Sequence, residues 1–297
     1  MSDEHHHGPV EFNRAFAIGI ALNTGFVAVE AFYGWKVDSL ALLADAGHNL
    51  SDVVGLVLAW GGVLAGRIRP NARHTYGWKR ASILAAFANA LLLLVAMGSL
   101  AWEAIGRLSH PSPVQGSTIM AVAGIGIVIN TATALLFMKG REHDLNIRGA
   151  FLHMAADAVV SAGVVISGLA IMLTGMHWID PVVSLIIAVV ILVSTWGLLR
   201  DSVNLAMDHV PESINVEVVR TYLTGLPGVT EVHDLHIWAL STTEIALTVH
   251  LVRPSAGTDD ALLERVGSEL QKRFGIGHAT LQVEDGAPCA LAPLDVV

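Results

Sequence analysis

The chain has 297 residues, of which 53% are hydrophobic and only 14% are charged, and its mean hydropathy is +0.59. A soluble domain is typically about 25% charged, so this composition excludes an ordinary soluble protein. The net charge is −9, and residues 207–297 carry most of it, with thirteen acidic against five basic residues. That distribution excludes nucleic-acid binding, which needs a basic face. It favours cations as partners, or serves only to keep a domain soluble.

Six segments are long and apolar enough to cross a bilayer, which requires about 20 mostly apolar residues. We predict these spans at residues 14–35, 40–66, 80–107, 116–138, 149–175 and 180–200. The first is not expected to be a cleaved signal, because an acidic, His-bearing tail precedes it in place of a basic region. From about residue 207 the long apolar runs end, which indicates a separate domain.

Basic residues are distributed unequally between the connections. Nine lie before the first span or in the second-to-third and fourth-to-fifth connections, whereas the other connections hold only Lys36 and Arg107. The positive-inside rule then places both termini in the cytoplasm. The single cysteine, Cys289, excludes an internal disulfide and suits a cytosolic tail. We therefore expect a cytosolic tail (1–13), a six-span domain (14–206), a cytosolic domain (207–286) and a C-terminal tail (287–297).

Two of the predicted spans carry the same polar pattern, His-x-x-x-Asp. The second span holds His48 and Asp52, and the fifth holds His153 and Asp157. Residues four apart share one face of a helix, so two packed helices would gather these side chains into a four-ligand cage. Small residues flank both pairs and permit that approach. Two buried His–Asp hydrogen bonds between helices, or a proton relay, would use the same residues.

The ligand types of this cage suit zinc, which accepts imidazole and carboxylate in a tetrahedral arrangement. Calcium and magnesium prefer oxygen alone, and copper(I) favours sulfur. The ligand types do not exclude cobalt, nickel, cadmium or iron(II) as the bound ion. Four further polar residues lie in the predicted spans, at Asn23, Glu30, Asp45 and Asn130. The two asparagines are candidates for hydrogen bonds to cage ligands and the two acids for an entry or exit path, with helix–helix hydrogen bonding as the alternative.

A metal site between membrane helices favours transport, because a carrier needs a midplane site that opens to alternate sides. Imidazole and carboxylate bind metal only when deprotonated, so metal binding is linked to proton release. An intramembrane metallohydrolase would need an open zinc position and a general base, commonly in His-Glu-x-x-His, and the sequence lacks that motif. A metal-sensing receptor would need a signalling module for which the tail has little room. We expect a transporter and not an enzyme.

The tail sequence predicts a small domain of order αββαβ, a ferredoxin-like unit. The elements are expected at residues 213–224, 229–240, 244–252, 258–274 and 278–284. Its strands carry several candidate metal ligands, namely His233, His236, His250, His278 and Glu284. Ordinary surface histidines on a sheet are the alternative.

These features together resemble the cation diffusion facilitator family, in its zinc-type branch. The resemblance is carried by Ser39 to Asp52, His74 to Arg80 and Val232 to Trp238, and it covers residues 13–284. It implies a homodimeric Zn²⁺/H⁺ antiporter of the inner (plasma) membrane that exports metal from the cytoplasm. It also implies that His48, Asp52, His153 and Asp157 form the transport site.

The resemblance also implies roles for residues near and within the tail. His233, His250, His278 and Glu284 match a cytosolic metal site, and Asp285 matches an acidic ligand of other members, while His236 is left unassigned. His74 matches one ligand of a loop site, but Trp78 stands where a second histidine would be, so at most a weak site is expected. Lys79, Arg80 and Asp208 match a charge contact between membrane and tail. The tail residues His5 to His7 either capture metal weakly or have no role.

Overall fold

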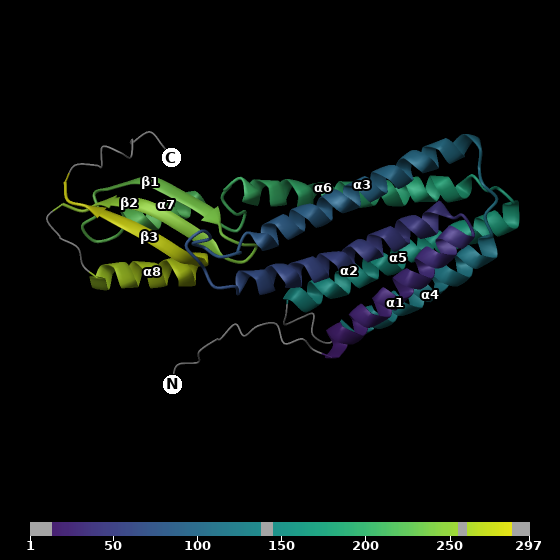
Figure 1. Ribbon diagram of the computed structural model, residues 1–297, viewed down its shortest axis with the longest axis horizontal. Helices are drawn as coiled ribbons and strands as arrows, with labels where there is room; N and C mark the ends of the chain where they lie inside the picture. Colours follow the sequence, from purple (N-terminus) through teal and green to yellow (C-terminus); the bar gives the residue numbers. More distant parts are fainter. Residues whose placement is uncertain (1–13, 138–144, 255–259, 287–297) are drawn as a thin grey trace. The chain divides into compact units, whose positions relative to one another are not determined.

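A computed structural model describes residues 14–137, 145–254 and 260–286. Figure 1 labels the helices and strands that these residues form. The six long helices are α1 (Arg14–Lys36), α2 (Leu40–Gly66), α3 (Ala81–Ser109), α4 (Gly116–Phe137), α5 (Leu145–Thr174) and α6 (Ile179–Ala206). The tail elements are α7 (Val216–Thr224), β1 (Glu231–Ala239), β2 (Ile245–Val252), α8 (Asp260–Phe274) and β3 (Ile276–Glu284). The predictions for residues 1–13, 287–297 and His5 to His7 lie outside the described residues.

Each predicted span coincides with one of the helices α1 to α6 to within a few residues. Among the described residues, four helices are long and apolar enough to cross a membrane: Ala81–Ser109, Gly116–Leu135, Phe151–Thr174 and Ile179–Ala206. Large apolar side chains point outward from these helices, including Trp102, Leu173 and Val193 at 80%, 73% and 71% exposure. Such exposure suits a hydrocarbon surrounding, because water would make it costly.

The described residues divide into two compact units. The first unit comprises the described residues within Met1–Leu56 and Ala90–Trp196. The second unit comprises the described residues within Val57–Asn89 and Gly197–Val297. The first unit therefore holds α1, α4, α5 and most of α2, α3 and α6. The C-terminal part of α2, the N-terminal part of α3 and the C-terminal part of α6 belong to the second unit together with the small sheet domain.

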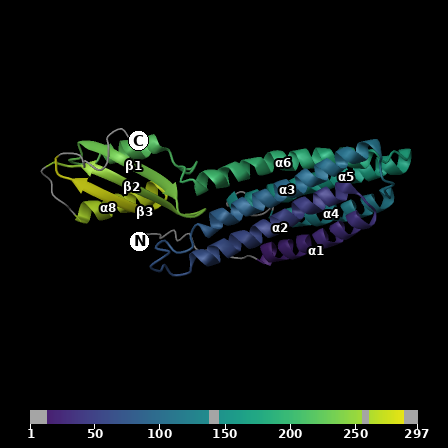
Figure 2. The same cartoon turned by 45° about the horizontal axis from the view of Figure 1, so that its top comes forward.

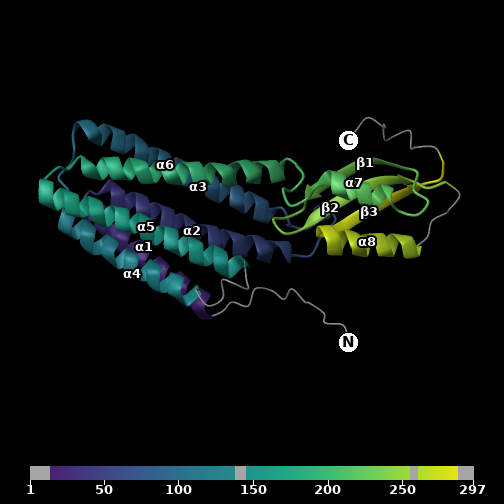
Figure 3. The same cartoon turned by 180° about the vertical axis from the view of Figure 1, so that it is seen from behind.

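Close helix packing in the first unit depends on glycine. The helices α4 and α5 run side by side, as Figure 3 also shows. A Cβ atom on Gly116 would lie 2.4 Å from the carbonyl oxygen of Gly168, and one on Gly168 would lie 2.8 Å from that of Gly116. Only glycine permits two backbones to approach so closely. This packing fixes α5, which carries His153 and Asp157.

The N-terminus of α2 is held by a carboxylate from α6. Asp180 is 1% exposed, and its Oδ1 accepts a hydrogen bond from Ser39 Oγ at 2.5 Å. Its Oδ2 accepts another from the backbone N–H of Leu40 at 2.8 Å. The first N–H groups of a helix have no partner within the helix, so a carboxylate there both caps it and complements its dipole. Asp180 thus fixes the start of the helix that carries His48 and Asp52.

The sheet domain contains one three-stranded sheet in the order β1-β2-β3 (Figure 2). β1 and β2 pair antiparallel, whereas β2 and β3 pair parallel and are joined through α8. The observed order αββαβ matches the predicted order. Apolar residues of the strands meet those of α7 and α8 in one core that includes Leu223, Leu247 and Leu270. The ladder of β1 shifts register between His233 and His236, and Asp234 there has φ of 50°.

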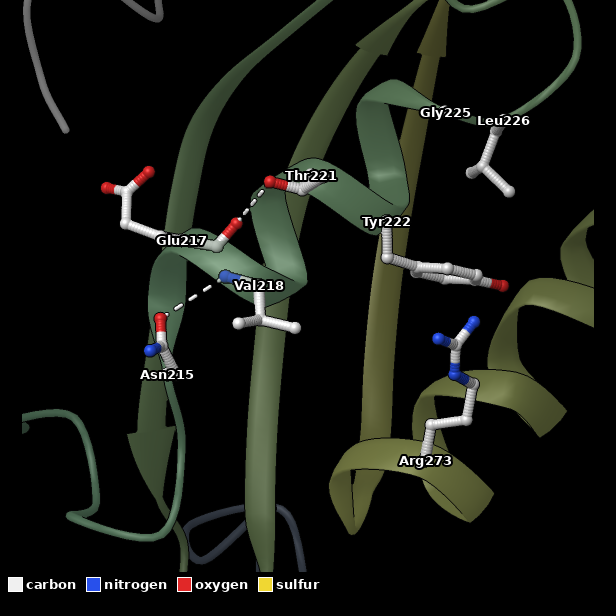
Figure 4. Close-up of a pocket in the computed structure, with 8 residues that line it drawn as sticks. All are labelled: Asn215, Glu217, Val218, Thr221, Tyr222, Gly225, Leu226 and Arg273. Atoms are coloured by element: carbon white, nitrogen blue, oxygen red, sulfur yellow. Dashed lines mark hydrogen bonds between the residues drawn. The ribbon is translucent and has the colours of Figure 1, made fainter.

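Figure 4 shows the side chains that cap the start of α7 and that join its other end to α8. Asn215 caps the helix, because its Oδ1 accepts a hydrogen bond from the N–H of Val218 at 3.2 Å. At the other end, the guanidinium of Arg273 on α8 lies 5.1 Å from the ring centre of Tyr222. This cation–π contact ties the last turn of α8 to α7.

The glycine contact yields a matched pair of stability predictions. We expect Gly168→Ala to lower the free energy of unfolding by about 1–3 kcal/mol, because the added Cβ would overpack the α4–α5 contact. Gly124→Ala on α4 adds a Cβ with nothing within 4 Å. That control should leave stability unchanged or raise it, since alanine favours helix by about 1 kcal/mol. Thermal unfolding in detergent measures both, and equal midpoints would contradict the packing argument.

Candidate metal sites

The four residues of the two His-x-x-x-Asp patterns converge in the first unit. His153 Nε2 lies 3.2 Å from Asp52 Oδ2 on the other helix and 3.7 Å from Asp157 Oδ2 on its own. His48 Nε2 lies 3.6 Å from Asp157 Oδ1 and 3.9 Å from Asp52 Oδ2. Ligand atoms of Asp52, His153 and Asp157 all lie within 4.8 Å of one another. Both within-helix and cross-helix pairs are therefore close, as the shared spacing predicts.

The cage is partly open and lies against an apolar cavity. Asp157 is 1% exposed, whereas the side chains of His48, Asp52 and His153 are 21%, 34% and 39% exposed. A cavity of about 540 Å³ is lined by His48, His153, Asp157 and apolar residues of α5 and α6. Within the described part of the chain, no Lys or Arg forms an ion pair with the cage. While the two imidazoles are neutral, the two carboxylates carry a charge that a divalent cation would neutralise.

The structure separates the other four polar residues predicted in the spans. Asn23 Nδ2 lies 3.4 Å from Met154 Sδ, next to the cage ligand His153. The side-chain oxygen and nitrogen of Asn130 are buried with no hydrogen-bond partner, so Asn130 is not joined to a cage ligand. Glu30 and Asp45 are both 0% exposed and lie together. They therefore do not line an open path in this conformation.

A second cluster forms where the three strands meet in the sheet domain. Glu284 Oε2 lies 3.0 Å from His233 Nε2, and Glu284 Oε1 lies 3.0 Å from His250 Nδ1. Strand register explains the convergence, because His233 pairs with His250 across β1 and β2, and Glu284 pairs with Val252 across β2 and β3. His233 and Glu284 are 4% and 8% exposed. The three ligands lie close enough together to hold one metal ion.

Asp234 joins this cluster although the sequence analysis did not single it out. Its carboxylate lies 3.5 Å from His250 Nε2 and 2.9 Å from His236 Nε2. The irregular register and positive φ at this position turn its side chain toward both histidines. The only sequence signal is its place between two histidines in His-Asp-Leu-His, and a β-bulge cannot be read from that pattern.

The structure does not bring His278 into the cluster. His278 lies six residues before Glu284 on β3, which is roughly 20 Å along a strand. It pairs in register with Ala246, and its ring lies 5.5 Å from that of Tyr76. Asp285 follows the end of β3 and is exposed. Within this chain the strand register therefore separates His278 from the three converging ligands.

The connection between α2 and α3 has contacts of its own. His74 stacks on Trp78 with ring centres 4.8 Å apart, and both are exposed or half-buried. No group of three candidate ligands includes His74 among the described residues. Arg80 forms an ion pair with Asp208, and Lys79 forms one with Glu244. The expected contact of Lys79, Arg80 and Asp208 thus has Glu244 as a further partner.

Comparison with known proteins identifies the family. Residues 16–205 match the model for the cation efflux transmembrane domain, and residues 211–286 match that for the cation efflux protein cytoplasmic domain. Zinc transporter ZitB of Escherichia coli is 38% identical over 94% of this chain and 90% of its own length. The cadmium, cobalt and zinc/H⁺–K⁺ antiporter of Bacillus subtilis is 34% identical over 95% of this chain and 92% of its own.

Two further relatives come from Cupriavidus metallidurans. The metal cation efflux system protein CzcD is 34% identical over 97% of this chain and 91% of its own length. The solved metal-bound C-terminal domain of the CzcD transporter is 36% identical, with a TM-score of 0.23, over 24% of this chain and 99% of the domain. Two family models that together span most of the chain, and relatives that match almost its full length, make this chain a member of the cation efflux family, which consists of transporters and not enzymes.

Proposed function

We propose that this chain exports divalent metal ions, principally zinc, from the cytoplasm in exchange for protons. The convergence of His48, Asp52, His153 and Asp157 carries the proposal. Family membership and the names of the relatives support it, since one is a zinc transporter and another a cadmium, cobalt and zinc antiporter. Cadmium and cobalt are therefore the nearest alternative substrates.

The distances in the cage fit a tetrahedral zinc ion. Ligands about 2.0–2.1 Å from zinc at tetrahedral angles lie about 3.3 Å from one another. The four His–Asp separations run from 3.2 to 3.9 Å, whereas the ring centres of His48 and His153 lie 6.0 Å apart. Small side-chain movements would close the difference. The set of two imidazoles and two carboxylates disfavours calcium and magnesium as substrates, because these ions prefer oxygen ligands.

Proton exchange follows from the charge of the site. Zinc neutralises Asp52 and Asp157 while it is bound. After the ion leaves, two bare carboxylates between membrane helices would be costly, so protons take its place. The same protonation weakens the ligands and releases the metal. A proton gradient directed inward can therefore drive metal outward through one site.

We propose the following topology for this activity. The helices α1 to α6 span the inner (plasma) membrane as a bundle, with both termini in the cytoplasm. Residues 14–206 then form the transport domain and residues 207–286 a ferredoxin-like cytosolic domain. The asymmetry of the basic residues supports this orientation, and the exposed apolar surface of the helices supports their place in the bilayer.

We also propose that the chain acts as a homodimer and that the second cluster binds a regulatory metal ion. His233, His250 and Glu284 would be the ligands, with Asp234 beside them. The ion pairs of Arg80 with Asp208 and of Lys79 with Glu244 support a mechanical link between the sheet domain and the start of α3. Exposed pairs contribute little stability, so their role would be positioning.

The transport site is tested by zinc flux into proteoliposomes under an imposed pH gradient. We expect flux to follow the gradient in the wild type and to fall roughly 100-fold or more in Asp157→Ala, which loses a ligand and one of the site's two carboxylates. Asp201→Ala is the matched control, because Asp201 is exposed near the end of α6 and contacts Arg200. If Asp157→Ala transported zinc as well as the control, the cage would be structural.

Metal preference should depend on the imidazole ligands. We expect His48→Asp to raise the ratio of manganese to zinc flux about tenfold. Manganese prefers carboxylate oxygen ligands, whereas zinc binds imidazole nitrogen well. Competition between the two ions in proteoliposomes measures this ratio. His110→Asp alters an exposed histidine beyond α3 and is the control. An unchanged ratio in His48→Asp would argue against His48 as a ligand.

The second cluster, formed by His233, His250 and Glu284 and here called the cytosolic cluster, is tested in full-length protein that carries Asp157→Ala. In that background the cage no longer contributes to zinc binding. We expect Glu284→Ala to weaken zinc binding at least about tenfold, because Glu284 contacts both histidines. His278→Ala should retain binding, since the strand register separates His278 from the cluster. Calorimetric titration measures both affinities. Loss of binding in His278→Ala would show that another arrangement brings this residue to the metal.

A further inference from the structure

The first unit contains a second buried group of titratable side chains, apart from the cage. Glu30 of α1 and Asp45 of α2 are both 0% exposed, and one oxygen of each lies within 3.5 Å of the same amide nitrogen, Asn49 Nδ2. Asn49 and Ser161 beside them are 4% and 0% exposed. Neither acid is a ligand in the proposed transport site. Two buried acids between membrane helices nevertheless need a physical explanation.

The partners of this pair are few. Ser161 Oγ donates to Asp45 Oδ2 at 3.1 Å. Asn49 Nδ2 lies 3.4 Å from Asp45 Oδ1 and 3.5 Å from Glu30 Oε2. Glu30 Oε1 is buried with no donor to satisfy it. Among the described residues, the other titratable groups that face the pair are Asp157 of α5 and His48 of α2, and neither Lys nor Arg is among them.

This geometry requires a proton. Both acids are buried and share one amide donor, so a proton on one of them is needed to avoid two uncompensated negative charges in a dry site. Two carboxylates that share a dry site do not both ionise unless a nearby cation compensates them, so the pair shares one proton while no cation is near. Asn49 turns its amide nitrogen, a donor, toward both acids, and a metal cation in the same place would need acceptors. The observations therefore favour a shared proton over a bound cation.

We propose that Glu30 and Asp45 form a proton-binding site, separate from the metal cage, that holds one shared proton while the cage is empty and releases it when a metal ion binds. The inference rests on the proposed transport function. In the release step one O–H bond of the pair breaks, the proton passes to water, and the pair changes from one negative charge to two. The reverse step takes a proton from water as the metal leaves.

The position of the pair allows this exchange. Asp45 precedes His48 by three residues on α2, a rise of about 4.5 Å along the helix. Ser161, which bonds Asp45, lies one helical turn from Asp157 on α5. Charges at this separation interact strongly in a medium of low dielectric constant, so two positive charges in the cage favour the ionised pair. In the proposed topology the pair lies on the extracytoplasmic side of the cage, from which protons enter.

Proton release on zinc binding tests the proposal with full-length protein in detergent. Calorimetric zinc titrations in two buffers of different ionisation enthalpy give the number of protons released per protein at saturation. We expect Glu30→Gln to bind zinc and to release about one proton fewer than the wild type. Glu103→Gln is the matched control, because Glu103 is an exposed carboxylate of the same unit that pairs with Arg107. The cytosolic cluster contributes equally to all three proteins and cancels in the difference.

The titration also separates this inference from the proposed function. If Asp157→Ala binds as many zinc ions as the wild type, the cage proposal fails. If Asp157→Ala loses one zinc but Glu30→Gln releases as many protons as the wild type, the cage stands and the proton site is refuted. Loss of potassium on zinc binding, in place of the missing proton, would likewise refute it by making the pair a monovalent cation site.

A second measurement does not depend on any variant's folding. In the infrared difference spectrum of the wild type, zinc should remove a C=O stretching band of a protonated carboxyl group. Protonated cage carboxyl groups would contribute to the same absorption, so Asp45→Asn and Glu30→Gln should each lose less of it than the wild type, whereas Glu103→Gln should lose as much. A wild-type spectrum in which zinc removes no such band would overturn the proposal.

Discussion

Negative charge between apolar helices is the constraint on which this structure depends. Asp52 and Asp157 meet where α2 and α5 pack, with His48 and His153 beside them but with no Lys or Arg partner among the described residues. Such carboxylates persist only if a cation or protons compensate them. The site is therefore built to exchange one positively charged ligand for another.

The surrounding packing serves to keep α2 and α5 in place. Asp180 caps the start of α2, and the glycine contact of α4 fixes α5. Met97 of α3 packs against α2 at Gly47, where a Cβ would lie 2.8 Å from its terminal methyl. A methyl group at this position would displace the end of the Met97 side chain, which packs beside His48. Close packing by small residues thus sets the ligand distances, and the ligand distances set which ion fits.

The two clusters of candidate ligands differ in ways that suit different tasks. The cage is built from two helices, is partly exposed and adjoins a cavity, so its ligands can exchange an ion. The cytosolic cluster is built from three hydrogen-bonded strands and is nearly buried, so its ligands are held rigidly. Rigid ligands favour tight binding and slow release, which the proposed regulatory ion would need. If Glu30 and Asp45 share a buried proton, metal binding in the cage would release a proton from this second site as well.

The sequence by itself determined the elements of local origin. Apolar runs specified the six long helices, and alternation with turn residues specified the order αββαβ. The repeat of His-x-x-x-Asp predicted the cage, because helical periodicity fixes which side chains share a face.

Tertiary structure alone decided what depends on register and on packing between distant segments. The register of β3 excluded His278 from the cluster and a bulge in β1 admitted Asp234. The packing of α1, α2 and α5 brought Glu30, Asp45 and Ser161 together. Strand register and helix contacts join residues far apart in the chain, and no local pattern records which of the possible pairings has the lowest free energy.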